Sequence, residues 1–156
     1  MCGLTGFVSP SAVVAADAER QVQAMAGRIR HRGPDDAGVW SDAEAGFAIA
    51  HRRLSIVDLS PAGHQPMHSA SGRWVLAYNG EVYNHLSLRQ QLEGEGAAPA
   101  WRGHSDTETL LACMEAWGVE RTLRASVGMF ALALWDRSER TLTLARDRIG
   151  EKPLYY

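Results

Sequence analysis

The order of strand-like and helix-like segments is the feature that most constrains the fold of this chain. Residues 39–53 and 129–146 each hold two apolar runs around a short polar stretch, which is the pattern of an antiparallel hairpin. Apolar residues recur at helical spacing at 17–30, 86–92 and 110–117. The strands come as hairpins, and the helices are grouped between them. This order predicts an α+β fold of antiparallel sheets and helical layers, and not the βαβ order of a nucleotide-binding sheet.

Local signals add two strands and one helix boundary to this outline. Apolar runs predict short strands at 2–8 and 73–79. Ser105 and Glu108 have the spacing of a capping box and stand directly before the third helical pattern. We therefore expect that helix to begin next to Ser105.

Length, composition and charge indicate one domain of ordinary polarity. With 156 residues, 46% of them hydrophobic and 22% charged, the chain is expected to form a single domain over 1–156. The formal net charge of −2 gives no reason to expect a nucleic-acid partner. No apolar run reaches the roughly 18 residues of a membrane helix, and no signal-peptide pattern opens the chain. We expect a cytoplasmic protein with neither a membrane nor a nucleic-acid partner.

Two other kinds of site are not expected from the sequence. Two cysteines, Cys2 and Cys113, do not make a disulfide framework. His64 and His68 are four residues apart, but Pro66 between them disrupts the helix that a metal-binding pair at this spacing requires. We therefore predict free thiols and no metal site.

Cys2 stands directly after the initiator Met1. Because Cys is small, we expect removal of Met1, which leaves one residue with both a thiol and a free α-amine. Thiols ordinarily titrate at about 8.5 and α-amines at about 7.7 to 8.0, so such an amine is available as a base near neutral pH. One residue then supplies both nucleophile and general base. Position alone favours an incidental apolar residue at a chain end, and Cys113 fits a small core residue of the third helix.

Several segments together resemble a known family. The opening Cys2-Gly3-Leu4-Thr5-Gly6 resembles class II glutamine amidotransferases. Five further segments are similar to asparagine synthetases in residues, order and spacing: His31-Arg32-Gly33-Pro34-Asp35, Arg53-Leu54-Ser55-Ile56-Val57-Asp58, Asn79-Gly80-Glu81-Val82-Tyr83-Asn84, Ser105-Asp106-Thr107-Glu108, and the tail 146–156. The resemblance runs from Cys2 to the last residue.

The resemblance implies roles for particular residues. The Asn79 side-chain amide and the Gly80 N–H would form an oxyanion hole for the tetrahedral intermediate of amide hydrolysis. Arg53 would bind the carboxylate of free glutamine with its planar guanidinium, and Asp106, paired with Glu81, would bind the ammonium group. The full implied set consists of catalytic Cys2, Asn79 and Gly80, with Arg53, Leu54, Ser55, Ile56, Val57, Asn79, Gly80, Glu81 and Asp106 contacting the substrate.

Four of these residues also have simpler interpretations. Asn79-Gly80 is a common type I′ turn pair. Arg53 fits a solvated charge at a strand end. Asp106 fits an acidic residue that stabilises the first turn of a helix through its dipole.

The resemblance also implies a fold and a reaction. The fold would be the four-layer αββα sandwich of N-terminal-nucleophile hydrolases. L-glutamine would be hydrolysed to glutamate and ammonia through a γ-glutamyl thioester on Cys2, without a cofactor. A full asparagine synthetase also has a C-terminal synthetase domain that uses ATP and Mg and carries a Ser-Gly-Gly-x-Asp-Ser loop, which is absent from this sequence.

Partners and rival functions stay open at this point. We expect the chain to supply ammonia to a C-terminal synthetase domain or subunit, and a homodimer is an open alternative to a monomer. One rival function is an amidotransferase domain that serves another acceptor, such as a polysaccharide or natural-product precursor. A second rival is a non-catalytic glutamine-binding module, which retention of Met1 would favour.

Overall fold

The computed structural model describes residues 1–56 and 59–156. The helices and strands in chain order are β1 (Gly3–Val8), α1 (Ala15–Arg28), β2 (Asp36–Asp42), β3 (Phe47–Arg53), β4 (Met67–His68), β5 (Trp74–Val82), α2 (His85–Gly94), α3 (Asp106–Trp117), α4 (Val119–Ala125), β6 (Gly128–Asp136) and β7 (Thr141–Arg146). Two short 3-10 turns lie at Arg30–Arg32 and Pro61–Gly63.

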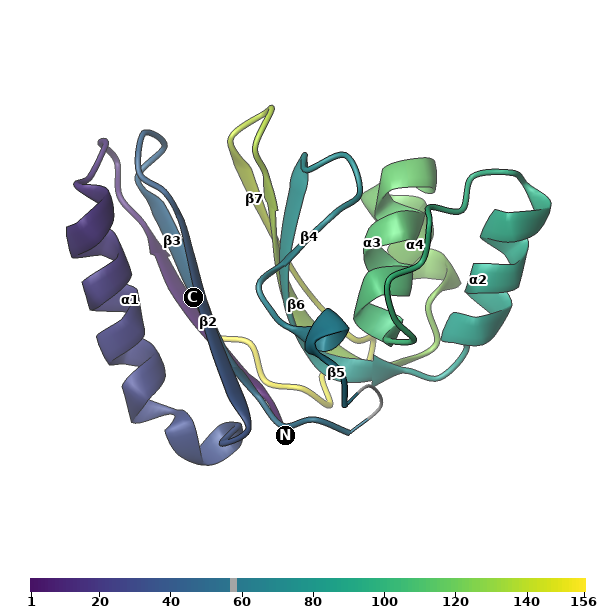
Figure 1. The fold of residues 1–156 in the computed structure, drawn as a ribbon, viewed down its shortest axis with the longest axis horizontal. Coiled ribbons are helices and arrows are strands. Elements are labelled where there is room, and N and C mark those ends of the chain that lie inside the picture. Colours follow the sequence, from purple (N-terminus) through teal and green to yellow (C-terminus); the bar gives the residue numbers. More distant parts are fainter. Residues whose placement is uncertain (57–58) are drawn as a thin grey trace.

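These elements form four layers (Figure 1). One sheet has the strand order β1-β3-β2, and the second has the order β4-β5-β6-β7. Every strand pair is antiparallel. Helix α1 covers the outer face of the first sheet, while α2, α3 and α4 lie beyond the second sheet. The αββα sandwich expected from the family resemblance is confirmed.

Apolar residues pack in each interface between the layers. Phe47 of one sheet stacks on Trp135 of the other, with ring centroids 4.3 Å apart. Small side chains let α1 lie close to the first sheet, because Ala18 and Ala26 pack near Ala48. The largest cluster lies between the second sheet and its helices, and its fully buried members include Leu76, Leu92, Leu110, Leu111, Met114, Leu132 and Leu134.

The hairpin predicted at 129–146 is confirmed, and its turn shows why it forms. The Asp136 carboxylate accepts hydrogen bonds from the backbone N–H groups of Ser138, at 2.9 Å, and Glu139, at 3.2 Å. Such side-chain bonds to nearby backbone groups favour tight turns. Arg140 completes the turn with a φ of 50°, in the left-handed region.

Several predicted boundaries were wrong. The first helix begins at Ala15 and ends at Arg28, and residues up to Arg32 form a 3-10 turn instead of more helix. The first arm of the 39–53 hairpin begins earlier, at Asp36, because pairing with β3 extends it past the apolar residues. Strand β4 and helix α4 were not predicted, since two and seven residues are too short to show a period.

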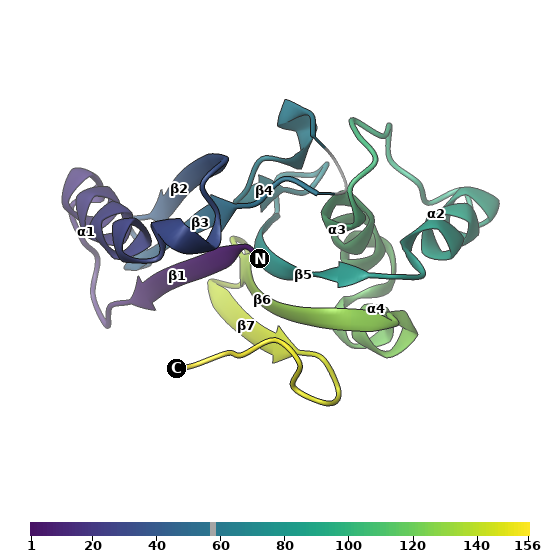
Figure 2. The same cartoon turned by 90° about the horizontal axis from the view of Figure 1, so that it is seen from below.

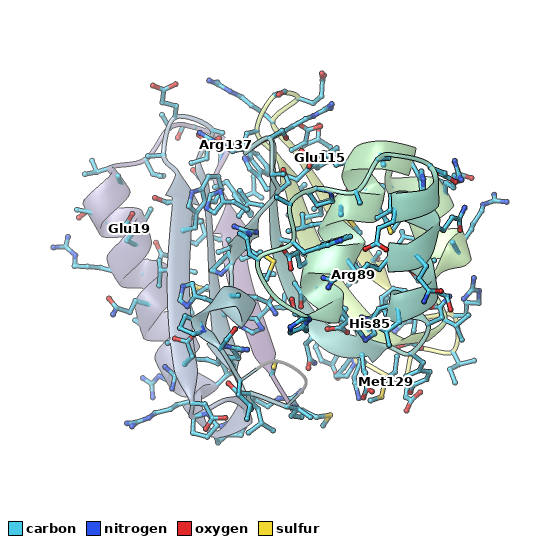
Figure 3. The ribbon with its side chains drawn as sticks, turned by 45° about the vertical axis from the view of Figure 1, so that its right-hand side comes forward. Glu19, His85, Arg89, Glu115, Met129 and Arg137 are labelled. Carbon is cyan, nitrogen blue, oxygen red and sulfur yellow. The ribbon has the colours of Figure 1, made fainter. Side chains whose placement is uncertain are left out.

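The predicted capping box is half correct. Ser105 caps α3 by accepting a hydrogen bond from the Glu108 N–H at 3.2 Å. The Glu108 carboxylate does not return to Ser105. It accepts instead from the backbone N–H groups of Arg102, at 2.8 Å, and Gly103, at 3.0 Å. Arg89, which belongs to α2 (Figure 3), lies 3.4 Å from the Glu108 carboxylate. Glu108 therefore holds the loop before α3 in place.

Candidate active site

One small pocket of about 100 Å³ is lined by most of the residues that the sequence analysis singled out. Ser55 lies outside its lining and instead donates its N–H to the Asp35 carboxylate at 2.9 Å. Val57 lies outside the described residues. The predicted residues that do line the pocket are Cys2, Arg53, Leu54, Ile56, Asn79, Gly80, Glu81 and Asp106.

Cys2 stands at the start of the first sheet, immediately before β1, and the chain's N-terminus lies beside β5 (Figure 2). Its Sγ accepts a hydrogen bond from the Leu54 N–H at 3.4 Å and lies 3.6 Å from the Leu54 carbonyl oxygen. The Arg32 guanidinium donates to the Cys2 carbonyl through Nε, at 3.3 Å, and Nη2, at 3.2 Å. These contacts hold the backbone and the thiol of Cys2 at the pocket.

Asn79 and Gly80 lie within β5, where they pair with Ala131 and Phe130 of β6. The type I′ turn interpretation is therefore wrong, and so is the predicted strand end at Asn79. The strand continues because Gly80 has no side chain: a methyl carbon there would lie 2.6 Å from the Phe130 Cα. Close packing of two neighbouring strands thus requires glycine at this position.

The Gly80 N–H points to the pocket edge of β5. On that edge, Gln65 Oε1 accepts a hydrogen bond from the Tyr78 N–H at 2.7 Å. Asp106 Oδ2 accepts one from the Val82 N–H at 2.9 Å. Because N–H directions alternate along a strand, the Gly80 N–H between them faces the same way. It therefore has the direction that an oxyanion-hole donor needs.

Arg53 is the last residue of β3, and its side chain is buried. Its Nη1 donates to the Ser60 carbonyl at 3.0 Å. The interpretation of Arg53 as a solvated strand-end charge is therefore wrong. A buried guanidinium that lines a pocket is well placed to bind a carboxylate.

Asp106 begins α3 and connects that helix to β5. Its Oδ2 accepts from the Tyr78 hydroxyl at 2.8 Å as well as from the Val82 N–H, and its Oδ1 accepts from the Thr107 N–H at 3.0 Å. Burial, followed by the nearby Asp106 and Glu81 carboxylates, raises the pKa of Tyr78 well above its ordinary value, so the phenol stays a donor. The helix-start interpretation of Asp106 holds together with its place at the pocket.

Sequence reasoning gave no role to several residues that line this pocket, among them Gly63, Gln65, Tyr78 and Lys152. The Gln65 amide accepts from Tyr78 and donates to the Thr107 hydroxyl at 3.4 Å. Lys152 is buried, and its Nζ lies 3.4 Å from the Met1 sulfur. Tyr78 stands directly before Asn79, and Lys152 lies in the tail segment of the family resemblance, whereas Gln65 had no such signal.

The second cysteine, Cys113, is buried, whereas Cys2 lines the pocket. Burial raises the pKa of the Cys113 thiol to about 12, which keeps it protonated in the core. Over residues 1–56 and 59–156, no three His, Cys, Asp or Glu side chains gather in a metal-binding group. None of the helices in this part of the chain has the length and apolarity needed to cross a membrane.

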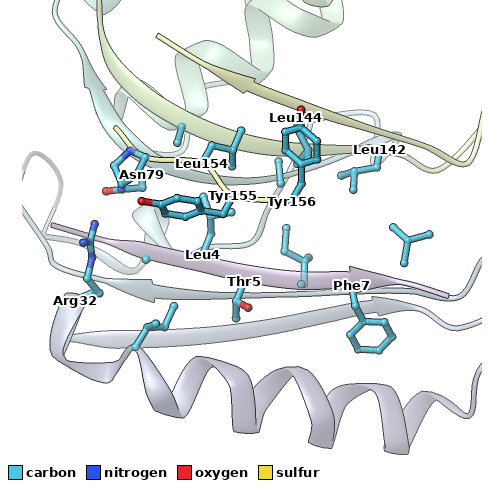
Figure 4. Close-up of a pocket in the computed structure, with 18 of the residues that line it drawn as sticks. Leu4, Thr5, Phe7, Arg32, Asn79, Leu142, Leu144, Leu154, Tyr155 and Tyr156 are labelled. Carbon is cyan, nitrogen blue, oxygen red and sulfur yellow. The ribbon is translucent and has the colours of Figure 1, made fainter. Parts of the chain in front are cut away.

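A larger cavity of about 690 Å³ lies between the two sheets and shares Asn79 with the pocket (Figure 4). Its walls are mainly apolar, with Leu4 from the first sheet and Leu142 from the second. Residues 153–156 run along it, and the tyrosines at positions 155 and 156 are exposed. Asn79 therefore stands between the pocket and this apolar space.

Comparison with known structures identifies the class of fold. Glutamine phosphoribosylpyrophosphate amidotransferase from Bacillus subtilis superposes with a TM-score of 0.72 at 20% sequence identity, covering 92% of this chain and 37% of that one. At this identity the likeness concerns the fold alone. The four-layer αββα sandwich of this chain is therefore a fold that it shares with that amidotransferase.

Sequence comparison then identifies the family. The model of the glutamine amidotransferase domain matches residues 1–156, and the chain belongs to this family. A putative glutamine-hydrolysing asparagine synthetase of Mycobacterium tuberculosis (strain H37Rv) is 42% identical over 167 residues, which cover 99% of this chain and 25% of the relative. Glutamine-hydrolysing asparagine synthetase 1 of Bacillus subtilis is 38% identical over 157 residues, covering 100% of this chain and 24% of the relative. The chain thus spans about a quarter of the length of these relatives.

Proposed function

We propose that this chain hydrolyses L-glutamine with Cys2 as the nucleophile, after removal of Met1. The observation that carries the proposal is the meeting of Cys2, Arg53, Asn79 and Gly80 at one pocket in a member of the glutamine amidotransferase family. These residues offer a thiol, a guanidinium for a carboxylate, and two donors for an oxyanion. This combination supplies the groups needed for nucleophilic amide hydrolysis on an amino-acid substrate.

In the proposed reaction, the Cys2 α-amine accepts the thiol proton and Sγ bonds to the side-chain amide carbon of glutamine. The Asn79 amide and the Gly80 N–H donate to the tetrahedral oxyanion. The C–N bond then breaks, and the proton from the thiol leaves with the ammonia. Water attacks the remaining γ-glutamyl thioester, the C–S bond breaks, and glutamate and the free thiol form.

Substrate contacts follow from the charges around the pocket. Arg53 binds the α-carboxylate of glutamine, and Leu54 and Ile56 line the same pocket. Glu81 and Asp106 bind the α-ammonium group. No metal or other cofactor takes part in these steps.

We further propose that the ammonia serves the ATP- and Mg-dependent conversion of aspartate to asparagine. That step requires a C-terminal synthetase domain or subunit. The support is the names of the relatives, which are glutamine-hydrolysing asparagine synthetases about four times the length of the match.

The test is glutamate release from L-glutamine by the purified chain, with intact mass recorded to establish that Met1 is absent. Cys2→Ala should abolish release, and the matched control Cys113→Ala should retain it because that thiol lies in the core. Turnover that survives in Cys2→Ala would contradict the assignment of the nucleophile. A correctly trimmed parent without turnover or a γ-glutamyl adduct would contradict the proposed hydrolysis.

A further inference from the structure

The turn Pro61–Gly63 lies directly against the guanidinium of Arg53. The Ser60 carbonyl oxygen accepts hydrogen bonds both from Arg53 Nη1, at 3.0 Å, and from the Gly63 N–H, at 3.2 Å. The Ser60 hydroxyl also accepts from the Ala62 N–H at 3.2 Å, which closes the turn. The same carbonyl therefore shapes the turn and holds one arm of the guanidinium.

Gly63 contacts the guanidinium at a point where no side chain fits. A methyl carbon added at Gly63 would lie 2.6 Å from Arg53 Cζ and closer still to Nη2, and its three nearest atoms all belong to this guanidinium. At Gly33, by contrast, the added carbon would meet backbone carbonyl carbons at 2.5 and 2.6 Å. A methyl group at Gly63 therefore displaces a flexible side chain and leaves the main chain untouched.

The turn itself is tied to both sheets and has little freedom to retreat. On one side, His64 Nδ1 lies 2.7 Å from the Asp36 carboxylate at the start of β2. Gln65 then binds the Tyr78 N–H of β5 at 2.7 Å through its side chain. A methyl group at position 63 consequently moves the guanidinium and not the turn.

We propose that Gly63 is a positioning residue for substrate recognition, whose missing side chain lets the Arg53 guanidinium present its fork to the α-carboxylate of glutamine. This inference rests on the proposed function, because it assigns that carboxylate to Arg53. A bidentate guanidinium–carboxylate pair depends on planar alignment, so a displaced fork loses substrate binding. The chemistry at Cys2 depends on other contacts and keeps its rate once substrate is bound.

The test compares Gly63→Ala with the parent chain and with Gly27→Ala, a matched control on α1 where an added methyl meets no atom within 4 Å. Gly63→Ala should raise KM for L-glutamine about tenfold or more while kcat changes less than about twofold. The Kd for glutamine, measured in a Cys2→Ala background, should rise in parallel. The melting temperatures of Gly63→Ala and the parent should coincide.

A double variant separates positioning from a general structural effect. In an Arg53→Lys background the fork is absent, so Gly63→Ala should change KM far less than it does in the parent. Equal effects of Gly63→Ala in both backgrounds would overturn the role of Gly63 and leave the proposed function standing. The same conclusion would follow if the parent hydrolyses glutamine and Gly63→Ala leaves KM unchanged. A parent that neither binds nor hydrolyses glutamine would overturn both.

Discussion

The Tyr78 hydroxyl donates a hydrogen bond to the Asp106 carboxylate at 2.8 Å, joining the middle of β5 to the first residue of α3. Both side chains are buried. Because Asn79 follows Tyr78 directly, this bond places the helix start, the strand and the predicted oxyanion donors in one rigid unit. The bond thus connects the packing of the helical layer to the geometry of the pocket.

Removing the hydroxyl should weaken this unit. Tyr78→Phe should lower the free energy of unfolding by about 2 kcal/mol, because a buried hydrogen bond to a carboxylate is lost while the ring stays in place. KM for glutamine should rise as Asp106 loses one of its constraints. Denaturant unfolding and steady-state kinetics measure the two effects. Tyr83→Phe, at an exposed position, is the matched control, and equal behaviour of the two variants would contradict this role.

The buried His51 should make stability depend on pH. Its Nε2 donates to the Tyr78 carbonyl at 2.9 Å, so Nδ1 is the unprotonated nitrogen, and no described residue binds it. Burial, partly offset by this bond, lowers the pKa of His51 from 6.5 to about 4. Between these values the unfolded chain binds a proton that the folded chain does not. Stability should therefore fall as pH drops from 6.5 toward 4, by up to about 3 kcal/mol.

Thermal unfolding at a series of pH values measures this dependence. His51→Gln keeps a donor for the Tyr78 carbonyl but cannot be protonated, so its stability should change less over the same pH range. His31→Gln replaces an exposed histidine and should follow the parent. A parent whose stability is flat from pH 6.5 to 4 would show that His51 does not govern the acid response.

The two thiols should react at very different rates with iodoacetamide. The thiolate is the reacting species, and burial raises the pKa of Cys113 to about 12, whereas Cys2 lines an accessible pocket. Intact-mass analysis of the folded chain should show one adduct, placed on residue 2 by peptide mapping. Cys2→Ala should stay unmodified until denaturant is added, and rapid labelling of folded Cys2→Ala would contradict the burial of Cys113.

The Asn79 side chain should matter for catalysis more than for folding. Asn79→Ala should lower kcat for glutamine hydrolysis about 10²- to 10³-fold, since one oxyanion donor is removed, with a smaller change in KM. Asn84→Ala is a useful contrast, because that side chain binds the Ala125 carbonyl at 3.0 Å and the Val127 N–H at 2.9 Å. Asn84→Ala should lower the free energy of unfolding and leave kcat unchanged. A reversed pattern would place the Asn79 role in folding.

Local sequence patterns were sufficient to predict many of the helices and strands. The 129–146 hairpin and the cap at Ser105 were predicted from signals that span a few residues, and the burial of Cys113 from its place in a helical apolar pattern. The αββα arrangement of layers was predicted only from the family resemblance, because periodicity does not say which faces meet. The catalytic and substrate roles assigned to Cys2 and Arg53 stay predictions.

Tertiary structure alone decided the environment of those residues. The Asn79-Gly80 pair suits a tight turn locally, yet pairing with β6 places it inside a strand, because hydrogen bonds to a partner strand outweigh a two-residue preference. Arg53 is buried where the turn at residues 61–63 packs against it, and Asp106 meets Tyr78 where α3 packs on β5. Some of these contacts, such as the bond between Asp106 and Tyr78, join segments that are tens of residues apart in the sequence. Burial of whole sheet and helix faces brings them together, and that long-range effect leaves no pattern in any short stretch of sequence.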